Sequence, residues 1–150
     1  MGTVTYPDIR VVGFINENMI PLQVRFDDKP LAEVFNVKWT PTIITLDASG
    51  KEHYRTVGFL APDEFLSTLH LGIAKAFFDT DMFEDALRKL ETLIQAYPSS
   101  DDVPEAIYLR GVSLYKTTHD PKKLREVYEK LKNDYPGSGW SKRAFPYRLL

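Results

Sequence analysis

The sequence predicts an α/β (α+β) fold, in which a truncated sheet with short helices is followed by an all-α helical tail. Strand-like runs occur only before residue 61, whereas after it apolar residues recur at steps of three and four. A second observation is an internal repeat inside the helical part. A chain of 150 residues with 43% hydrophobic residues is long enough to bury a core of this kind.

The first 36 residues predict a helix, a strand and a second short helix. Asp8 is placed to cap a helix that ends near Asn18. Residues 21–26 alternate apolar and polar side chains, which is typical of a half-buried strand. Residues 30–36 have helical spacing and end at an asparagine that suits a left-handed cap. The side chains expected to face the core from the strand are Leu22, Val24 and Phe26.

A β-hairpin is expected next. Residues 42–46 are rich in β-branched side chains and stop at the turn sequence of residues 47–50, after which residues 53–59 return as the second strand. A long amphipathic helix then begins near Pro62, a residue that the first turn of a helix accepts. Further helices are predicted over residues 82–97, 103–117 and 121–135.

The helical part contains an internal sequence repeat. The sequence Tyr97-Pro98-Ser99-Ser100 returns 38 residues later as Tyr135-Pro136-Gly137-Ser138, each time at the end of a predicted helix. The small residues Ala86 and Gly111 lie on apolar helix faces, where they would let neighbouring helices approach closely. These patterns predict two stacked helix hairpins.

Composition excludes several classes of function. The 19 basic and 21 acidic residues give a net charge of -2, so we expect no nucleic-acid partner and no membrane partner. The absence of cysteine excludes disulfides, thiolate zinc sites and dithiol redox chemistry in this chain. No leader segment is visible, so the compartment stays unknown: the chain reads as cytoplasmic as written, and as periplasmic if the native N-terminus is longer.

Residues 37–52, together with Arg55 and Gly58-Phe59, resemble the second half of bacterial thioredoxin-like proteins. The resemblance extends over about residues 5–70. It implies a cis-proline at Pro41, and it implies that the surrounding loop lines a groove in which an extended peptide lies. The residues that would form this peptide-binding or partner-binding site are Trp39, Thr40, Pro41 and Thr42. A packing role for Trp39 is the alternative, because a tryptophan contributes apolar area without a ligand.

The helical part resembles tetratricopeptide repeats of the looser bacterial type. The small, aromatic and terminal positions of one repeat are occupied by Ala74, Phe77, Phe83, Ala86, Leu90 and Pro98. The two resemblances divide the chain into residues 1–70, a thioredoxin-like region that lacks the first strands and the CxxC segment, and residues 71–150, a tetratricopeptide-like helical region. The repeats imply protein binding, and the alternative is that these helices only cap the thioredoxin-like core.

Candidate sites of other kinds are weak. His53, His70 and His119 lack the spacings of metal sites and are expected at the surface or on a strand face. Asp27-Asp28 and Asp101-Asp102 stand where helices begin, so we interpret them as helix caps and not as paired catalytic carboxylates. We therefore expect no metal, no cofactor and no catalytic residue. The last 30 residues carry eight basic and three acidic side chains, which fits either a solvated helix face or a patch for acidic partners.

The functional hypothesis is a non-catalytic, thioredoxin-like module for protein binding or self-assembly. A homo-oligomer is expected, because the family's central strand is absent and would leave a sheet edge unpaired. The alternative is that the chain is a remnant or fragment of a thiol-disulfide oxidoreductase whose CxxC segment lies upstream. Enzymatic activity in this chain itself is not expected, because dithiol exchange requires a thiolate.

Overall fold

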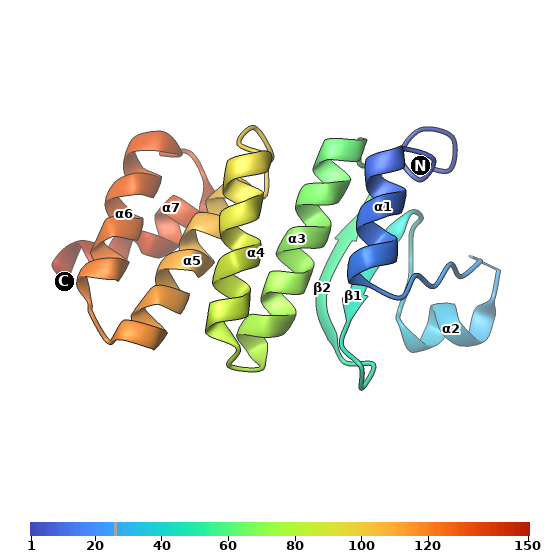
Figure 1. Cartoon of the computed structure of the whole chain (residues 1–150), viewed down its shortest axis with the longest axis horizontal. Coiled ribbons are helices and arrows are strands. Elements are labelled where there is room, and N and C mark those ends of the chain that lie inside the picture. Colours follow the sequence, from blue (N-terminus) through green and yellow to red (C-terminus); the bar gives the residue numbers. More distant parts are fainter. Residues whose placement is uncertain (26) are drawn as a thin grey trace.

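The computed structural model describes residues 1–25 and 27–150 (Figure 1). In chain order its elements are α1 (Ile9–Asn18), α2 (Lys29–Val34), β1 (Thr42–Leu46), β2 (Glu52–Val57), α3 (Pro62–Asp79), α4 (Phe83–Ala96), α5 (Val103–Thr118), α6 (Lys122–Asp134), α7 (Gly139–Ala144) and the 3-10 helix η1 (Phe145–Leu149). The predicted fold class is confirmed, because a small antiparallel sheet with helices is followed by a wholly helical part.

The helix cap, helix end and turn that the sequence predicts around the hairpin are all present in the structure. The Asp8 side chain accepts a hydrogen bond from the backbone N–H of Arg10 at 2.9 Å and so caps α1. Asn36 has a left-handed backbone with φ of 48° just beyond α2, as its sequence position predicted. β1 and β2 pair directly through the turn at Asp47, whose carboxylate accepts from Ser49 and Lys51.

The strand predicted over residues 21–26 is wrong for the residues that the structure describes, and Phe26 lies outside them. Residues 21–25 form neither strand nor helix. Leu22, expected in the core, is 73% exposed, and Val24 is exposed as well. The alternating pattern did not suffice because a strand is stabilised by a hydrogen-bonded neighbour, and β1 pairs only with β2 within the described chain.

The helices α1 and α3 cover one face of the hairpin. Val11 of α1 packs with Phe65, Leu66 and Leu69 of α3 in one buried cluster. The helix comes so close to the sheet that a Cβ atom on Gly72 would lie 2.3 Å from Oγ1 of Thr45. A residue without a side chain is therefore required at this crossing.

The register of the hairpin contains a β-bulge. Thr45 pairs with Tyr54, and the next residue, Leu46, pairs with Glu52, so His53 is an extra residue in β2. A bulge of this kind changes the direction in which nearby side chains point. Both His53 and Tyr54 contact side chains of α3, as described below.

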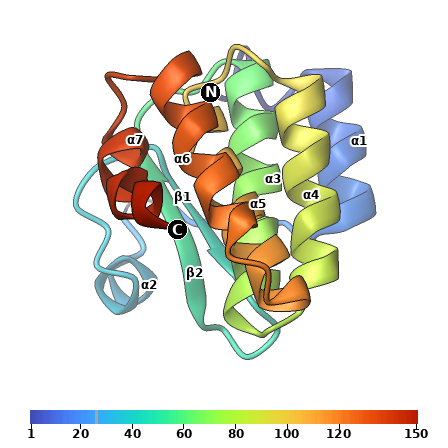
Figure 2. The same cartoon turned by 90° about the vertical axis from the view of Figure 1, so that its left-hand side faces the viewer.

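From α3 onward the helices stack side by side along the long axis of the molecule (Figure 1). Viewed from the α6 end, the strands lie on one side of this stack, with α1 and α4 on the other (Figure 2). Gly111 of α5 confirms the close approach expected of small residues, because a Cβ atom there would lie 1.8 Å from Cγ2 of Val127 in α6. The main buried cluster is built from α3 to α7 and includes Leu71, Leu90, Leu93, Val103, Ala106, Val127, Leu131 and Ala144.

The internal repeat has the same backbone geometry in both copies. Tyr97 ends α4 with φ and ψ of -127° and 54°, and Tyr135 ends α6 with -136° and 51°. In each turn the serine three residues later, Ser100 or Ser138, donates its backbone N–H to the tyrosine carbonyl at 3.0 Å. The repeated sequence therefore encodes a repeated turn.

The sequence prediction missed α7 and η1. The Ser138 side chain accepts from the N–H of Ser141 at 3.0 Å and caps α7, so α7 follows the second turn as α5 follows the first. A helix of six residues is too short to show apolar periodicity, and the recurrence of the turn was the only available signal. None of the described helices has the length and apolar character that crossing a bilayer would require.

Candidate functional site

The loop between α2 and β1 is anchored at its α2 end. The backbone N–H of Val37 donates to the carbonyl of Ala32 at 2.8 Å, which closes the helix. Arg55 of β2 donates from Nη2 to the carbonyl of Phe35 at 2.6 Å. The end of α2 is therefore bound to the hairpin, and the start of the loop is placed relative to β2.

The residues predicted to form a site, Trp39 to Thr42, are held by two hydrogen bonds at the other end of the loop. The hydroxyl of Thr42 donates to the carbonyl of Trp39 at 2.6 Å. The backbone N–H of Gly58, just beyond β2, donates to the carbonyl of Pro41 at 2.9 Å. The peptide bond between Thr40 and Pro41 is cis, the isomer that the thioredoxin-like resemblance implies.

The side chain of Trp39 is 70% exposed, so the alternative of a packing role in the core is wrong. Thr40 is exposed too, and Pro41 and Thr42 are half-buried. Two further apolar side chains lie at the neighbouring end of β2, where Val57 is 52% and Phe59 is 59% exposed. Val57 is the pairing partner of Thr42, which places it beside the loop.

Sequence reasoning missed Val57 and Phe59 as site residues. Both were expected within the returning strand, but their position opposite the Trp39 loop depends on the register of the hairpin. The three exposed side chains Trp39, Val57 and Phe59 are called the apolar rim below. An exposed group of large apolar residues is a feature of surfaces that bind other molecules.

The rim adjoins a sheet edge to which no strand is paired in the described parts of the chain. In an antiparallel pair, alternate residues direct their N–H and C=O groups away from the partner strand. β1 bonds β2 on one side, so its alternate peptide groups face outward on the other. An extended chain placed along β1 would satisfy these groups and reach the apolar rim.

Two charged residues of β2 near the loop, Arg55 and Glu52, pair with each other. Arg55 donates two hydrogen bonds to the carboxylate of Glu52, of 2.7 and 2.6 Å. These bonds lower the pKa of Glu52 and raise that of Arg55. Arg55 and Glu52 neutralise each other, so this pair adds little net charge beside the loop.

His53 lies in strand β2, one of the two positions expected for it, and it is buried and not at the surface. Its Nδ1 lies 2.7 Å from Oδ2 of Asp79 at the end of α3, and its Nε2 lies 2.9 Å from Oδ2 of Asp47 in the hairpin turn. Because carboxylates only accept hydrogen bonds, both ring nitrogens donate when the imidazole is protonated. The bonds to Asp79 and Asp47 raise the pKa of His53.

His70 is also buried, but in apolar surroundings. Its ring packs between Phe14 of α1, at 4.6 Å between ring centroids, and Tyr97 of the first repeat turn, at 5.9 Å. Nδ1 has no hydrogen-bond partner among the residues that the structure describes. Burial, with a smaller effect of the nearby Lys89 cation, lowers the pKa of His70 to about 4, so the ring is neutral at pH 7.

The interpretation of the aspartate pairs as caps is wrong for Asp28 and Asp102. Each is the N-cap residue of its helix, yet neither side chain accepts a hydrogen bond from the first turn. The Asp102 carboxylate instead accepts from Thr68 Oγ1 of α3 at 2.9 Å and lies 3.5 Å from the Tyr54 hydroxyl. Burial raises the pKa of Asp102.

Asp102 belongs to a polar layer that joins the hairpin, α3 and α5. Lys75 of α3 lies over the Tyr54 ring at 4.7 Å from its centroid and forms a 2.5 Å ion pair with Glu105. Every group in this layer has a partner, so its arrangement is that of a structural connection. In the part of the chain described, no three His, Asp or Glu side chains are grouped so that they could hold a metal ion.

Comparison with known families gives two matches. Residues 6–73 match the family described as thioredoxin-like domain. Residues 62–144 match the family described as outer membrane lipoprotein, YfiO. The two matches overlap in residues 62–73, which lie in α3, the helix that packs against the hairpin and against α4. Searches of curated proteins and of solved structures found no match.

Proposed function

Since the chain belongs to the outer membrane lipoprotein family of YfiO through residues 62–144 and carries a thioredoxin-like domain at residues 6–73, we propose that it is a protein-binding and assembly module. Its thioredoxin-like region binds an extended peptide segment at Trp39, Thr40, Pro41 and Thr42. The chain contains no cysteine, so this binding does not lead to dithiol exchange by its own residues.

The observation that carries the proposal is the exposed Trp39 at the end of the open edge of β1. A peptide added to β1 gains backbone hydrogen bonds along the edge, and its side chains on one face contact the apolar rim. Aromatic residues supply much of the binding free energy in protein interfaces, and Trp is the most enriched of them. The loop is held by Thr42, Gly58 and Arg55, so its conformation is present before the peptide arrives.

A second copy of the chain is one occupant that the open edge accommodates. Two β1 strands placed antiparallel around a two-fold axis would satisfy each other's outward peptide groups. The two-stranded sheet is small, and sheets of three or more strands are more stable. We therefore include homo-oligomerisation through β1 in the proposal. With the domain boundary at about residue 70, the helical region of residues 71–150 takes no part in the pairing of the two edges.

The peptide-binding part is tested by selecting ten-residue peptides from a displayed random library and measuring their affinity by isothermal titration calorimetry. We expect the substitution Trp39→Ala to weaken binding of the selected peptides about tenfold or more. Ile9→Ala is the matched control, because Ile9 is a large apolar side chain that is 81% exposed and belongs to α1, not to the loop or the hairpin. Equal affinities for the wild type and Trp39→Ala would refute the site.

The assembly part is tested by light scattering across a concentration series. We expect a mass that rises above that of the 17.2 kDa chain, and we expect Ile44→Lys, which places a charge on β1, to lower it. Ile9→Lys adds the same charge on α1 and serves as the control. A folded monomer at every concentration would refute self-assembly. The peptide site would then be tested by the calorimetry experiment alone.

A further inference from the structure

The charge of the chain is divided unequally along its length. The last 30 residues contain eight Lys and Arg against three acidic residues, whereas the first 120 contain eleven against eighteen. The C-terminal segment therefore has a net charge of +5 and the rest of the chain has -7. This segment forms α6, α7 and η1 at one end of the helix stack (Figure 1).

A groove lies within this basic end. Its volume is about 480 Å³, and it is bounded by α6 on one side and by α7 and η1 on the other. The residues that line it are Tyr128, Lys132, Pro136, Ser141, Lys142 and Phe145. Two aromatic rings and a proline supply an apolar floor, two lysines supply positive charge, and the lining contains no acidic residue. We call this surface the C-terminal groove.

The aromatic floor is built from two packed rings. Tyr128 and Phe145 meet edge to face with their centroids 6.2 Å apart, and Phe145 is 51% exposed. The Lys132 ammonium lies 5.5 Å from the Tyr128 centroid, and the Arg148 guanidinium lies 3.7 Å from that of Phe145. Each of the two rings therefore has one cation over it.

The two lysines of the groove form no ion pair among the described side chains, unlike Lys123 and Lys130 of α6. Lys123 pairs with Glu126 and Lys130 pairs with Asp134, both on α6. Lys132 and Lys142 are exposed and take part in no such ion pair. Their charges are therefore available to an incoming anion and are not already neutralised within the fold.

We propose that the C-terminal groove binds an acidic segment of a partner protein that carries an aromatic or large aliphatic side chain between carboxylates. The apolar side chain lies on Tyr128 and Phe145, and the carboxylates pair with Lys132 and Lys142. Charge complementarity favours this partner over a polar or basic one. A membrane or a nucleic acid is disfavoured, because a groove with two free lysines in a chain of net charge -2 offers few contacts to an extended anionic surface.

This site is distinct from the loop at Trp39, so the two proposals stand or fall separately. The probe is a fluorescein-labelled ten-residue peptide that alternates Glu and Phe, and the measurement is fluorescence anisotropy with the full chain. We expect saturable binding that weakens as salt is raised from 0.05 to 0.5 M, because the ion pairs are at the surface. A peptide that alternates Lys and Phe should not bind.

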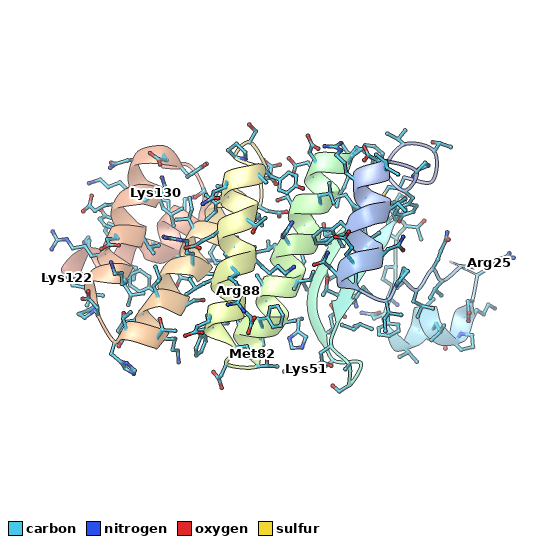
Figure 3. The ribbon with its side chains drawn as sticks, in the orientation of Figure 1. Arg25, Lys51, Met82, Arg88, Lys122 and Lys130 are labelled. Atoms are coloured by element: carbon cyan, nitrogen blue, oxygen red, sulfur yellow. The ribbon has the colours of Figure 1, made fainter. Side chains whose placement is uncertain are left out.

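The decisive variant is Lys132→Glu/Lys142→Glu, for which we expect at least a tenfold loss of affinity. Lys122→Glu/Lys130→Glu changes the net charge equally at two lysines of α6 that do not line the groove (Figure 3), and it should retain affinity within about twofold. Thermal unfolding followed by circular dichroism verifies that both variants are folded. Equal losses in the two variants would overturn the groove in favour of a general charge effect.

Vesicles containing anionic lipid and a labelled single-stranded oligonucleotide are tested with the same proteins. Binding of either one that Lys132→Glu/Lys142→Glu abolishes, together with no binding of the acidic peptide, would replace the proposed partner by a membrane or a nucleic acid. Failure of all three probes would overturn the site itself. None of these outcomes depends on the peptide site at Trp39.

Discussion

The imidazole ring of His53 and the carboxylate of Asp79 are 2.7 Å apart, which joins the bulge in β2 to the last residue of α3. The same ring contacts Asp47 in the hairpin turn through its other nitrogen. The bulge directs the His53 side chain toward α3, where the helix ends. One buried side chain therefore fixes the hairpin to the helix that both family matches share.

Replacement of His53 by Gln should reduce the loss of folding stability that the wild type shows as the pH is raised. Because the folded-state pKa is raised above 6.5, the protonated ring stabilises the fold fully below pH 6.5, and this contribution is lost as pH rises through the folded pKa. We expect His53→Gln to lower the unfolding free energy by about 1 kcal/mol at pH 6, with a smaller difference at pH 9.5. Urea unfolding at both pH values measures it.

The control for this prediction is His119→Asn. His119 is exposed and has a left-handed backbone at the end of α5, a conformation that asparagine tolerates. Its effect on unfolding is measured at the same two pH values and is the reference for the difference seen with His53→Gln. A deficit of His53→Gln that did not shrink at the higher pH would show that the ring acts only through packing.

Replacement of His70 by Leu should reduce the loss of stability in acid. The folded-state pKa of about 4 lies below the ordinary value of 6.5, so between these values the unfolded chain binds a proton that the folded one does not. Stability therefore falls as pH decreases from 6.5 to 4, by an amount on the order of 2 kcal/mol. A leucine at this position has no titratable group, so this acid-dependent loss of stability disappears. It also has no buried nitrogen that lacks a hydrogen-bond partner among the described residues.

Unfolding free energies of the wild type and His70→Leu at pH 7, 6, 5 and 4.5 test this prediction. The difference between the two proteins cancels the titration of the carboxylates that they share. The variant should gain on the wild type at each step toward acid. Parallel curves would mean that His70 is protonated within the fold, in conflict with its apolar position between Phe14 and Tyr97.

Replacement of Gly111 by Ala should destabilise the helical part. Alanine favours a helix over glycine by about 1 kcal/mol, so a loss of stability would report a steric conflict alone. The added Cβ would lie 1.8 Å from Cγ2 of Val127, and we expect a net loss of about 1–3 kcal/mol in thermal or urea unfolding. The double variant Gly111→Ala/Val127→Ala should show less than the sum of the two single losses.

Gly139→Ala is the matched control, because Gly139 is helical and nothing lies within 4 Å of a Cβ placed there. It should be neutral or slightly stabilising. If Gly111→Ala behaved in the same way, the close approach of α5 to α6 would not exist in solution.

Much of the candidate site was predictable from sequence because its residues are neighbours in the chain. Trp39, Thr40, Pro41 and Thr42 form one continuous loop, and their resemblance to a known family was visible without any structure. The contribution of Val57 and Phe59 was not predictable in the same way. Their proximity to Trp39 follows from the pairing of Thr42 with Val57, and register is a property of two strands together.

The sequence by itself determined the elements whose stabilising contacts are local. The cap at Asp8 and the repeated turns after Tyr97 and Tyr135 each form from hydrogen bonds between residues two to three positions apart. β1 followed from its β-branched side chains and the turn sequence after it, and the long helices followed from side-chain periodicity. Neither signal needs knowledge of distant segments.

Only the tertiary structure decided where a partner from elsewhere in the chain was needed. Residues 21–25 have the alternation of a strand but no neighbour to bond, so they form none. His53 is buried because Asp79 reaches it from 26 residues away, and Asp102 binds Thr68 across 34 residues and not the first turn of its own helix. Such contacts depend on how helices and strands pack against each other, because a polar side chain is buried where distant segments supply its hydrogen-bond partners.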